Sequence, residues 1–294
     1  MKPKCHQKIT KKAIQIYLDN CQNNLAEDLQ HNKWSVRMGS SDADTSPLIT
    51  RAKNWHFYKE NDFLIPFKGK LFGFPITYTP TSDEIFSHLV AQLKTEIVNG
   101  NTEEMFLWVG RILHHIQDMS TPSHVVPIFH GPFIDIEEGA DNTKDAFEEF
   151  SAAVIKEVLI DIVYDKPTLN NLVNDSGLSL QENYVLSAEN TLTLLFEGNQ
   201  SKIDCMIDGQ PKKIGFDFFW KKNDQSLDDE ESKHGFGHYG ILGNRFSDTS
   251  EIKVPPHRYK ISYDSYLGIY RQLISKMVQD STKTLSIIAG MLPA

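Results

Sequence analysis

Several features that define other protein classes are missing from this chain of 294 residues. It has three cysteines, Cys5, Cys21 and Cys205, and none forms a CxxC pair, so disulfides are not its main source of stability. No stretch approaches the roughly 18 consecutive apolar residues of a membrane-spanning helix. The sequence also has no internal repeat and no low-complexity linker. We therefore expect one globular domain over residues 1–294.

Basic residues are the minority among the charges. The chain has 30 lysines and arginines against 39 aspartates and glutamates, a formal net charge of −9. This balance argues against a nucleic-acid-binding protein that neutralises phosphates, and against an electrostatic anchor on anionic membranes. Residues 1–6 also lack the apolar core of a secretory signal peptide. Either the protein is not exported by that route, or the sequence is a trimmed mature chain.

Apolar residues at helical spacing predict a mainly α-helical (all-α) chain. Residues 31–81 are rich in proline and glycine and are expected to form a long irregular loop, of a length that is often functional. Asp208-Gly209 predicts a hairpin between residues 203–207 and 213–219, within a small irregular or β insert at 200–240. The predicted helices cover about residues 6–29, 83–98, 142–164, 179–197 and 262–290, and another begins after Thr102.

The most informative stretch is HHIQDMSTPSH, residues 114–124. His114 and Asp118 are four residues apart, on one face of a helix. A turn is expected at Thr121-Pro122, because the residue before a proline resists the helical region, and His124 can then swing back. Such side chains converging at a helix end suit a transition metal, above all zinc. A His-x-x-x-Asp pair is more often a plain surface pair; here it faces either solvent or a polar cavity between helices.

Three further pieces stand before this motif. They are His6 with Ile9 and Ala13, the segment GSSDAD at 39–44, and the segment NWHFY at 54–58. Together with His114-x-x-x-Asp118-x-Ser120-Thr121-Pro122-x-His124, their order resembles the bacterial zinc-dependent phospholipases C and, more distantly, the S1/P1-type nucleases. The resemblance covers residues 6 to about 150, and beyond it only helical character matches.

The resemblance implies an all-α fold with a cluster of two or three zinc ions. Carried over by position, one zinc would be held by Asp44, His56, His114 and Asp118. A second would be held by His6 and the bridging Asp118, and in the family it also binds the amine and carbonyl of the mature N-terminus. Asp44 would orient or deprotonate the attacking water.

His124 would begin a third zinc site, which the family completes with a His-x-x-x-Glu pair on the next helix. In this chain Lys144 stands at the position of that histidine and Glu148 at that of the glutamate. Protonated lysine is a poor ligand. Asp145 with Glu148 or Glu149 is the alternative set, since carboxylates also bind zinc.

Other residues are weaker candidates. Asp42 is the reserve for Asp44, and His130 is a rival ligand at the third site. His115 is expected to pack or to support a ligand, because it is turned by 100° from its neighbour around the helix. The glycine-rich segment 235–240 has no phosphate-loop spacing and is expected to be a tight turn or a lip of the active site. The long loop carries aromatic residues that could be core or could form a lipid-facing rim, namely Trp55, Phe57, Phe63, Phe67, Phe72 and Phe74.

The resemblance implies a secreted or exported bacterial phospholipase C, acting in lipid degradation and virulence. By metal-assisted hydrolysis it would cleave the glycerol-side phosphodiester of phosphatidylcholine- or phosphatidylglycerol-type lipids to diacylglycerol and a phosphorylated head group. The expected partner is a phospholipid at a membrane surface and not a nucleic acid, and the expected state is a monomer. A nuclease with the same metal chemistry and a catalytically silent binding protein on the same fold are the alternatives.

Overall fold

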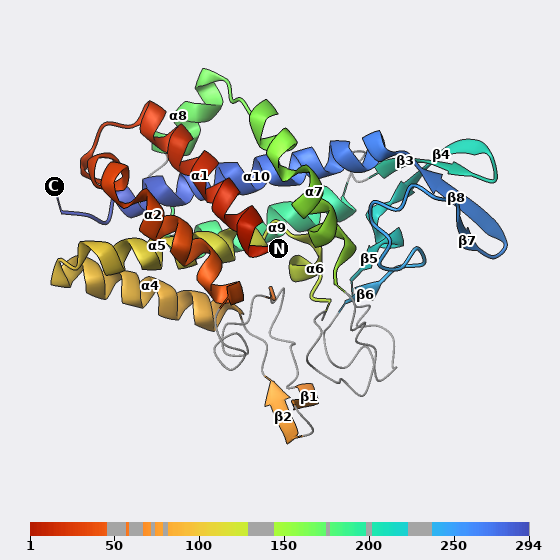
Figure 1. Ribbon diagram of the computed structural model, residues 1–294, viewed down its shortest axis with the longest axis horizontal. Helices are drawn as coiled ribbons and strands as arrows, with labels where there is room; N and C mark the ends of the chain where they lie inside the picture. Colours follow the sequence, from red (N-terminus) through yellow and green to blue (C-terminus); the bar gives the residue numbers. More distant parts are fainter. Residues whose placement is uncertain are drawn as a thin grey trace.

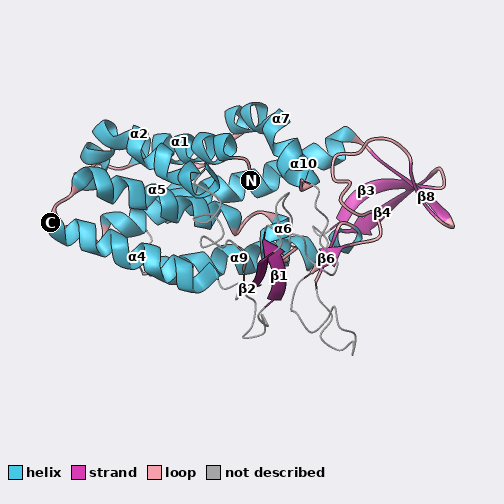
Figure 2. Cartoon of the chain, turned by 60° about the horizontal axis from the view of Figure 1, so that its bottom comes forward, coloured by secondary structure: helices cyan, strands magenta, loops and turns pink. Residues whose placement is uncertain are grey.

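The computed structural model describes residues 1–45, 57–58, 67–71, 74–78, 82–128, 144–174, 177–197, 202–222 and 237–293. Within these ranges the chain is mainly helical, as the periodicity predicted. The helices pack into an elongated body, and a small sheet projects from one end of it (Figures 1 and 2). None of the described helices is long and apolar enough to cross a membrane.

Helix α5 (Thr102–Asp118) lies in the middle of the helical body. The first half of the chain forms α1 (Pro3–Asn20), α2 (Asn24–Thr45), α4 (Ser82–Asn99), α5 and the short α6 (Pro122–Val125). The second half forms α7 (Ala146–Asp161), α8 (Lys166–Asn174), α9 (Leu180–Phe196) and α10 (Tyr263–Ala289). Because α5 packs against α1, α2, α4, α9 and α10, most of its polar stripe faces other helices and not solvent.

Two predictions about the first 81 residues need correction. The helix expected over 6–29 is two helices, because the chain turns extended at Cys21 (φ −122°, ψ 139°) before α2 begins. α2 then runs to Thr45, so residues 31–45 are helical and do not belong to a long loop. Beyond them the structure describes Phe57-Tyr58 and a hairpin of β1 (Phe67–Leu71) and β2 (Phe74–Tyr78). Trp55, Phe63 and Phe72 lie outside the described residues.

Gly39 stays inside α2 because α2 and α5 touch there backbone to backbone. A Cβ on Gly110 would lie 2.8 Å from the Gly39 Cα and would collide with the carbonyl oxygen of Val36. A Cβ on Gly39 would likewise collide with the carbonyl of Leu107. Only glycine permits this approach. It sets the last turns of the two helices side by side.

The strands form a region that extends past the expected insert. β3 (Lys202–Ile207) and β4 (Gln210–Gly215) make the predicted hairpin, and its turn residues Asp208 and Gly209 have φ of 51° and 79°, the positive values of a type I′ turn. The insert expected at 200–240 reaches Ile261, because β3 also pairs with β8 (His257–Ile261), which pairs with β7 (Ile252–Val254). The 3₁₀ helix Phe216–Phe218 leads to β5 (Trp220–Lys221), which pairs with β6 (His238–Tyr239).

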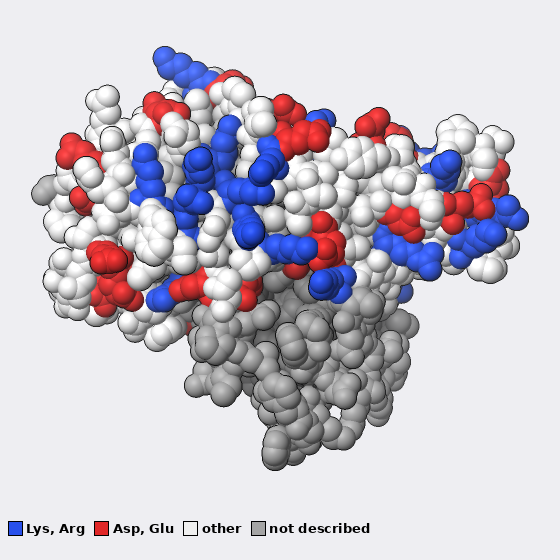
Figure 3. All heavy atoms as spheres, viewed as in Figure 1, with Lys and Arg blue, Asp and Glu red and all other residues white. Residues whose placement is uncertain are grey.

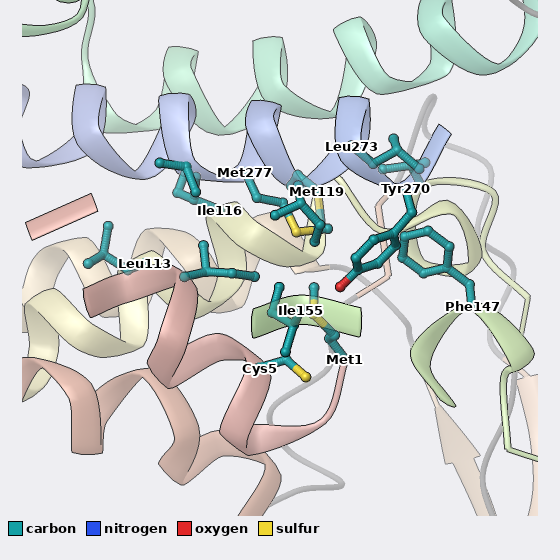
Figure 4. Close-up of a cluster of buried hydrophobic side chains, with 14 of the residues drawn as sticks. Met1, Cys5, Leu113, Ile116, Met119, Phe147, Ile155, Tyr270, Leu273 and Met277 are labelled. Carbon is teal, nitrogen blue, oxygen red and sulfur yellow. The ribbon is translucent and has the colours of Figure 1, made fainter. Parts of the chain in front are cut away.

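One hydrophobic core runs between the helices and on toward the sheet. Figure 4 shows the side chains that meet between α1, α5, α7 and α10, among them Cys5, Leu113, Ile155, Leu273 and Met277. The core continues toward the strands through tilted and edge-on aromatic rings, namely Phe147, Phe219, Trp220, Phe246 and Tyr266. All three cysteines are free thiols.

Candidate metal centre

Three buried side chains bring together atoms that can bind a metal ion. His6 of α1 and His114 and Asp118 of α5 each offer one ligand atom, and these atoms all lie within 4.8 Å of one another. The Nε2 atom of His114 is 3.1 Å from Oδ2 of Asp118, and that of His6 is 3.5 Å from Oδ1. One carboxylate oxygen therefore faces each imidazole, which is the arrangement of a bridging ligand.

A backbone contact orients the ring of His114. Its Nδ1 lies 3.0 Å from the carbonyl oxygen of Ser40, in α2. A carbonyl oxygen only accepts hydrogen bonds, so Nδ1 is the donor, and in the neutral ring Nε2 carries the lone pair. The glycine contact between α2 and α5 brings the Ser40 carbonyl within reach, since Ser40 follows Gly39.

A buried amide orients the ring of His6. Nδ1 of His6 lies 2.8 Å from Oε1 of Gln117, whose Nε2 donates to the hydroxyls of Thr10 (2.9 Å) and Ser281 (3.2 Å). The amide oxygen is thus the group presented to His6, and Nε2 of this ring also carries a lone pair. Support of the second ring nitrogen in this way is usual for histidines that bind metals. Gln117 was not among the predicted site residues, although it lies three residues after His114 on the same helix face.

Asp44 lies on the outer side of the two histidines. Its Oδ2 is 3.8 Å from Nε2 of His6, and its Oδ1 is 3.9 Å from Nε2 of His114. The Asp44 side chain is 17% exposed while both histidines are 0% exposed, so it is the member of the group that solvent reaches. Asp42, the reserve candidate, instead pairs with Arg111 at 2.7 Å.

His124 and Glu148 extend the group on the other side. Nδ1 of His124 is 4.0 Å from Oδ2 of Asp118, and its Nε2 is 3.2 Å from Oε1 of Glu148. The amine of Met1 lies 2.8 Å from the same Glu148 oxygen and 3.7 Å from Oδ1 of Asp118. A second cluster of donors therefore adjoins the first, and Asp118 is common to both.

Asp145 lies beside this group and caps the first turn of α7. Its Oδ1 accepts a hydrogen bond from the backbone N–H of Glu148 (3.1 Å), which caps α7, and its Oδ2 accepts one from the hydroxyl of Tyr239 (2.9 Å). Glu149 pairs with Lys2 at 2.7 Å. Glu148 is thus the carboxylate of the proposed third site that directly contacts His124, among the residues that the structure describes.

Two predicted ligands, His56 and His130, lie outside the described residues. The chain next to His56 reaches the centre: the ring of Phe57 stacks on His124 with centroids 5.3 Å apart, and Tyr58 N–H donates to the His124 carbonyl at 2.9 Å. Phe57 is 6% exposed and is part of the interior and not of an exposed rim.

The remaining candidates lie around the centre. His115 is fully buried with its ring 6.3 Å from that of Phe86, in keeping with a packing role. Lys144 is exposed. Residues 237–240 are the described part of the glycine-rich segment, and Gly237 donates to the carbonyl of Pro127, shortly after α6. This contact brings the segment close to His124, where a lip was one of the two expectations.

Burial and the neighbouring charges act on the pKa values of the cluster in opposite directions. Burial and the neighbouring His114 lower the pKa of His6 to about 3. Burial also lowers the pKa of His114, but the carboxylates of Asp118 and Asp44 outweigh it and raise that pKa to about 9. For Asp118 burial acts upward, yet His114 and His124 hold its pKa well below the ordinary range. The carboxylates of Asp118 and Asp44 therefore attract positive charge to this point, as a metal site does.

Comparison with known proteins supports the fold. A crystal structure of Clostridium perfringens alpha-toxin, from avian strain SWCP, resembles this chain with a TM-score of 0.54 and 13% sequence identity. The match covers 97% of this chain and 62% of the toxin, so the chain spans less than two thirds of its length. No protein-family model matches the sequence, and no curated protein does either. At this identity the likeness concerns the helical fold alone.

Proposed function

We propose that this protein is a zinc-dependent phosphodiesterase of the phospholipase C type. The observation that carries the proposal is the buried group of His6, His114 and Asp118, in which both Nε2 atoms face one carboxylate. The motif resemblance and the fold likeness to a bacterial toxin support it from separate directions. Residues 1–294 would act as one domain, because the core is continuous from the helices to the strands.

The donor set fits zinc. Neutral imidazole nitrogens and carboxylate oxygens are ordinary zinc ligands. Nε2 of His6 is buried and has no hydrogen-bond partner among the residues that the structure describes, which a bound cation would remedy. We assign one ion to Asp44, His56, His114 and Asp118, a second to His6 and Asp118, and a third position to His124 and Glu148.

Bound zinc would polarise the phosphoryl oxygens of the substrate and make a water molecule more acidic. The residues around it would do the rest. The partly exposed Asp44 would hold and deprotonate the attacking water, since its carboxylate lies beside both histidines. Ser40 and Gln117 would keep the imidazoles in place, so that the ligands need not reorganise when substrate binds.

The substrate would be a glycerophospholipid of the phosphatidylcholine or phosphatidylglycerol type, and the products diacylglycerol and a phosphorylated head group. The motif resemblance supports this choice of substrate. It also supports a monomeric protein that is secreted by a bacterium. The same centre could also cleave nucleic acid, so the experiment includes that substrate.

The test combines metal content with substrate choice. Purified protein is analysed for zinc by mass spectrometry and assayed on phosphatidylcholine, phosphatidylglycerol and single-stranded DNA, before and after chelation. We expect two or three zinc ions and a lipid hydrolysis that chelation abolishes and zinc restores. The variant His114→Ala, which removes a proposed ligand, should lose zinc and activity. Its control is His257→Ala, which removes an exposed histidine that pairs with Asp208 in the strand region and should keep both. Cleavage of DNA alone would make the protein a nuclease, and bound zinc without activity would make it a silent binding protein.

A further inference from the structure

Two stretches of the first two helices, residues 1–18 and 29–41, carry basic residues and no acidic residue. From Met1 to Leu18 the sequence has five lysines and no acidic residue. Lys4, Lys8 and Lys11 are spaced so that they share the outer face of α1. In α2, Lys33 and Arg37 are one turn apart, in a stretch without acidic residues from 29 to 41. Figure 3 shows lysines and arginines gathered over α1 and α2.

We name this surface the basic face; it consists of Lys4, Lys8, Lys11, Lys12, Lys33 and Arg37. None of these six residues forms an ion pair with any residue that the structure describes. Several basic residues elsewhere are paired with a carboxylate: Arg271 lies 3.2 Å from Asp161, and Lys276 lies 2.7 Å from Asp280. The positive potential of the basic face is therefore uncompensated locally, although the chain as a whole has a net charge of −9.

Two large apolar side chains stand out of α2 next to these charges. Trp34 is 65% exposed and Met38, one turn later, is 37% exposed. Trp34 lies three residues before Arg37 and four before Met38 in α2, so these side chains are neighbours on the helix and border the basic face. By contrast, Trp220 is 1% exposed in the core. A tryptophan and a second apolar side chain beside lysine and arginine are typical of proteins that lie on a lipid surface.

We propose that the basic face, together with Trp34 and Met38, docks this protein on an anionic phospholipid bilayer. The lysines and arginines attract the lipid phosphates, and the two apolar side chains enter the head-group layer. The exposed Trp34 and Met38 favour a bilayer over a nucleic acid, because a bilayer offers an interfacial layer that apolar side chains can enter. Met38 adds apolar area but no ring on which a base could stack. The net charge of −9 argues against an electrostatic anchor spread over the whole chain, whereas this docking rests on the local charge of the basic face. The docking goes beyond the proposed function and does not depend on it.

The strength of docking follows from the number of charges. Each lysine or arginine near an anionic membrane contributes roughly a fivefold gain in partitioning, and salt screens this attraction. Replacement of two lysines by glutamates reverses the charge at two positions, so that attraction to the anionic lipid becomes repulsion there. We therefore expect a loss of binding of more than about tenfold from such a change.

Vesicle sedimentation with the full chain tests the proposal. Vesicles of phosphatidylcholine alone and vesicles with about one third phosphatidylglycerol are compared at about 0.1 M and 0.5 M salt, in the cold and at once, so that little lipid is hydrolysed. We expect binding only to the anionic vesicles at low salt, a loss of more than about tenfold in Lys4→Glu/Lys11→Glu, and a clear loss in Trp34→Ala. Lys253→Glu/Lys260→Glu, two exposed lysines on the sheet with the same change in net charge, is the matched control and should bind like the parent.

Three results would overturn the docking proposal: equal loss in both double variants, no binding to either vesicle, or binding to single-stranded DNA that depends on the basic face while vesicles are ignored. A short-chain phosphatidylcholine that stays dissolved as single molecules separates docking from catalysis. On it, Lys4→Glu/Lys11→Glu should be as active as the parent, while on anionic bilayers it should be slower. Docking without hydrolysis of any lipid would refute the proposed function and leave this inference standing.

Discussion

The imidazole rings of His6 and His114 lie against each other with centroids 4.1 Å apart, and each Nδ1 has its own hydrogen-bond acceptor. The two rings come from α1 and α5, so the relationship depends on tertiary packing and not on local sequence. The outer hydrogen bonds aim both Nε2 atoms at Asp118. Metal affinity should therefore depend on residues that never touch the metal.

Replacement of Gln117 by leucine tests this dependence. The change removes the acceptor of His6 Nδ1 and keeps a similar volume, so we expect zinc affinity to fall about 10–100-fold while the number of ions bound at saturating zinc stays the same. Titration with zinc against a competing chelator measures both quantities. His114→Ala, which removes a ligand, should instead lower the number of ions. A Gln117→Leu protein with parental affinity would show that the amide has no supporting role.

The pH dependence of the metal-free protein should reveal the proton on His114. Its pKa is about 9 in the folded state against an ordinary 6.5. A raised folded-state pKa stabilises the fold fully below pH 6.5, and this stabilisation, at most about 3 kcal/mol, is lost as the pH rises to 9. The Tm of chelated protein should fall over this range, and less steeply in His114→Gln. The Met1 amine, with its pKa raised from 8.0 to about 12, acts in the same direction above pH 8 in both proteins. An equally steep fall in the variant would assign the titration to another group.

Asp145 and Glu148 should respond differently to removal of their charge. Asp145→Asn weakens the cap of α7 and the bond from Tyr239, so we expect a loss of about 1 kcal/mol in the free energy of unfolding with unchanged zinc content. Glu148→Gln alters the partner of His124 and should lower zinc content or affinity. Denaturant unfolding and elemental analysis of both variants decide between the carboxylates. Loss of zinc in Asp145→Asn alone would reverse the assignment.

The contact of α2 with α5 should not tolerate a methyl group. Gly110→Ala places a Cβ against the Gly39 Cα and the Val36 carbonyl, so the helices must separate, and we expect a destabilisation of more than about 2 kcal/mol. The matched control is Gly268→Ala in α10, where a Cβ meets nothing within 4 Å. That change should stabilise the protein by about 0.5–1 kcal/mol, because alanine favours the helix. Thermal unfolding measures both, and a stable Gly110→Ala protein would contradict the close approach.

Local patterns were sufficient to predict the helical class, the helix that begins after Thr102 and the turn at Asp208-Gly209. They failed where distant parts of the chain decide. Gly39 reads as a helix breaker, yet α2 continues through it because α5 packs there. β8 lies outside the expected insert because its partner β3 is far away in sequence. Gln117 looked like one polar residue among several, since its partners Thr10 and Ser281 are on other helices.

Because the cysteines are free, no disulfide links α1 to α5, and a metal ion bound between them would be a cross-link. A zinc ion held by His6 and Asp118 would hold α1 against α5. Its binding energy would then form part of the free energy of folding. Since α1 also carries most of the basic face, withdrawal of the metal would loosen the very surface that we expect to meet the lipid.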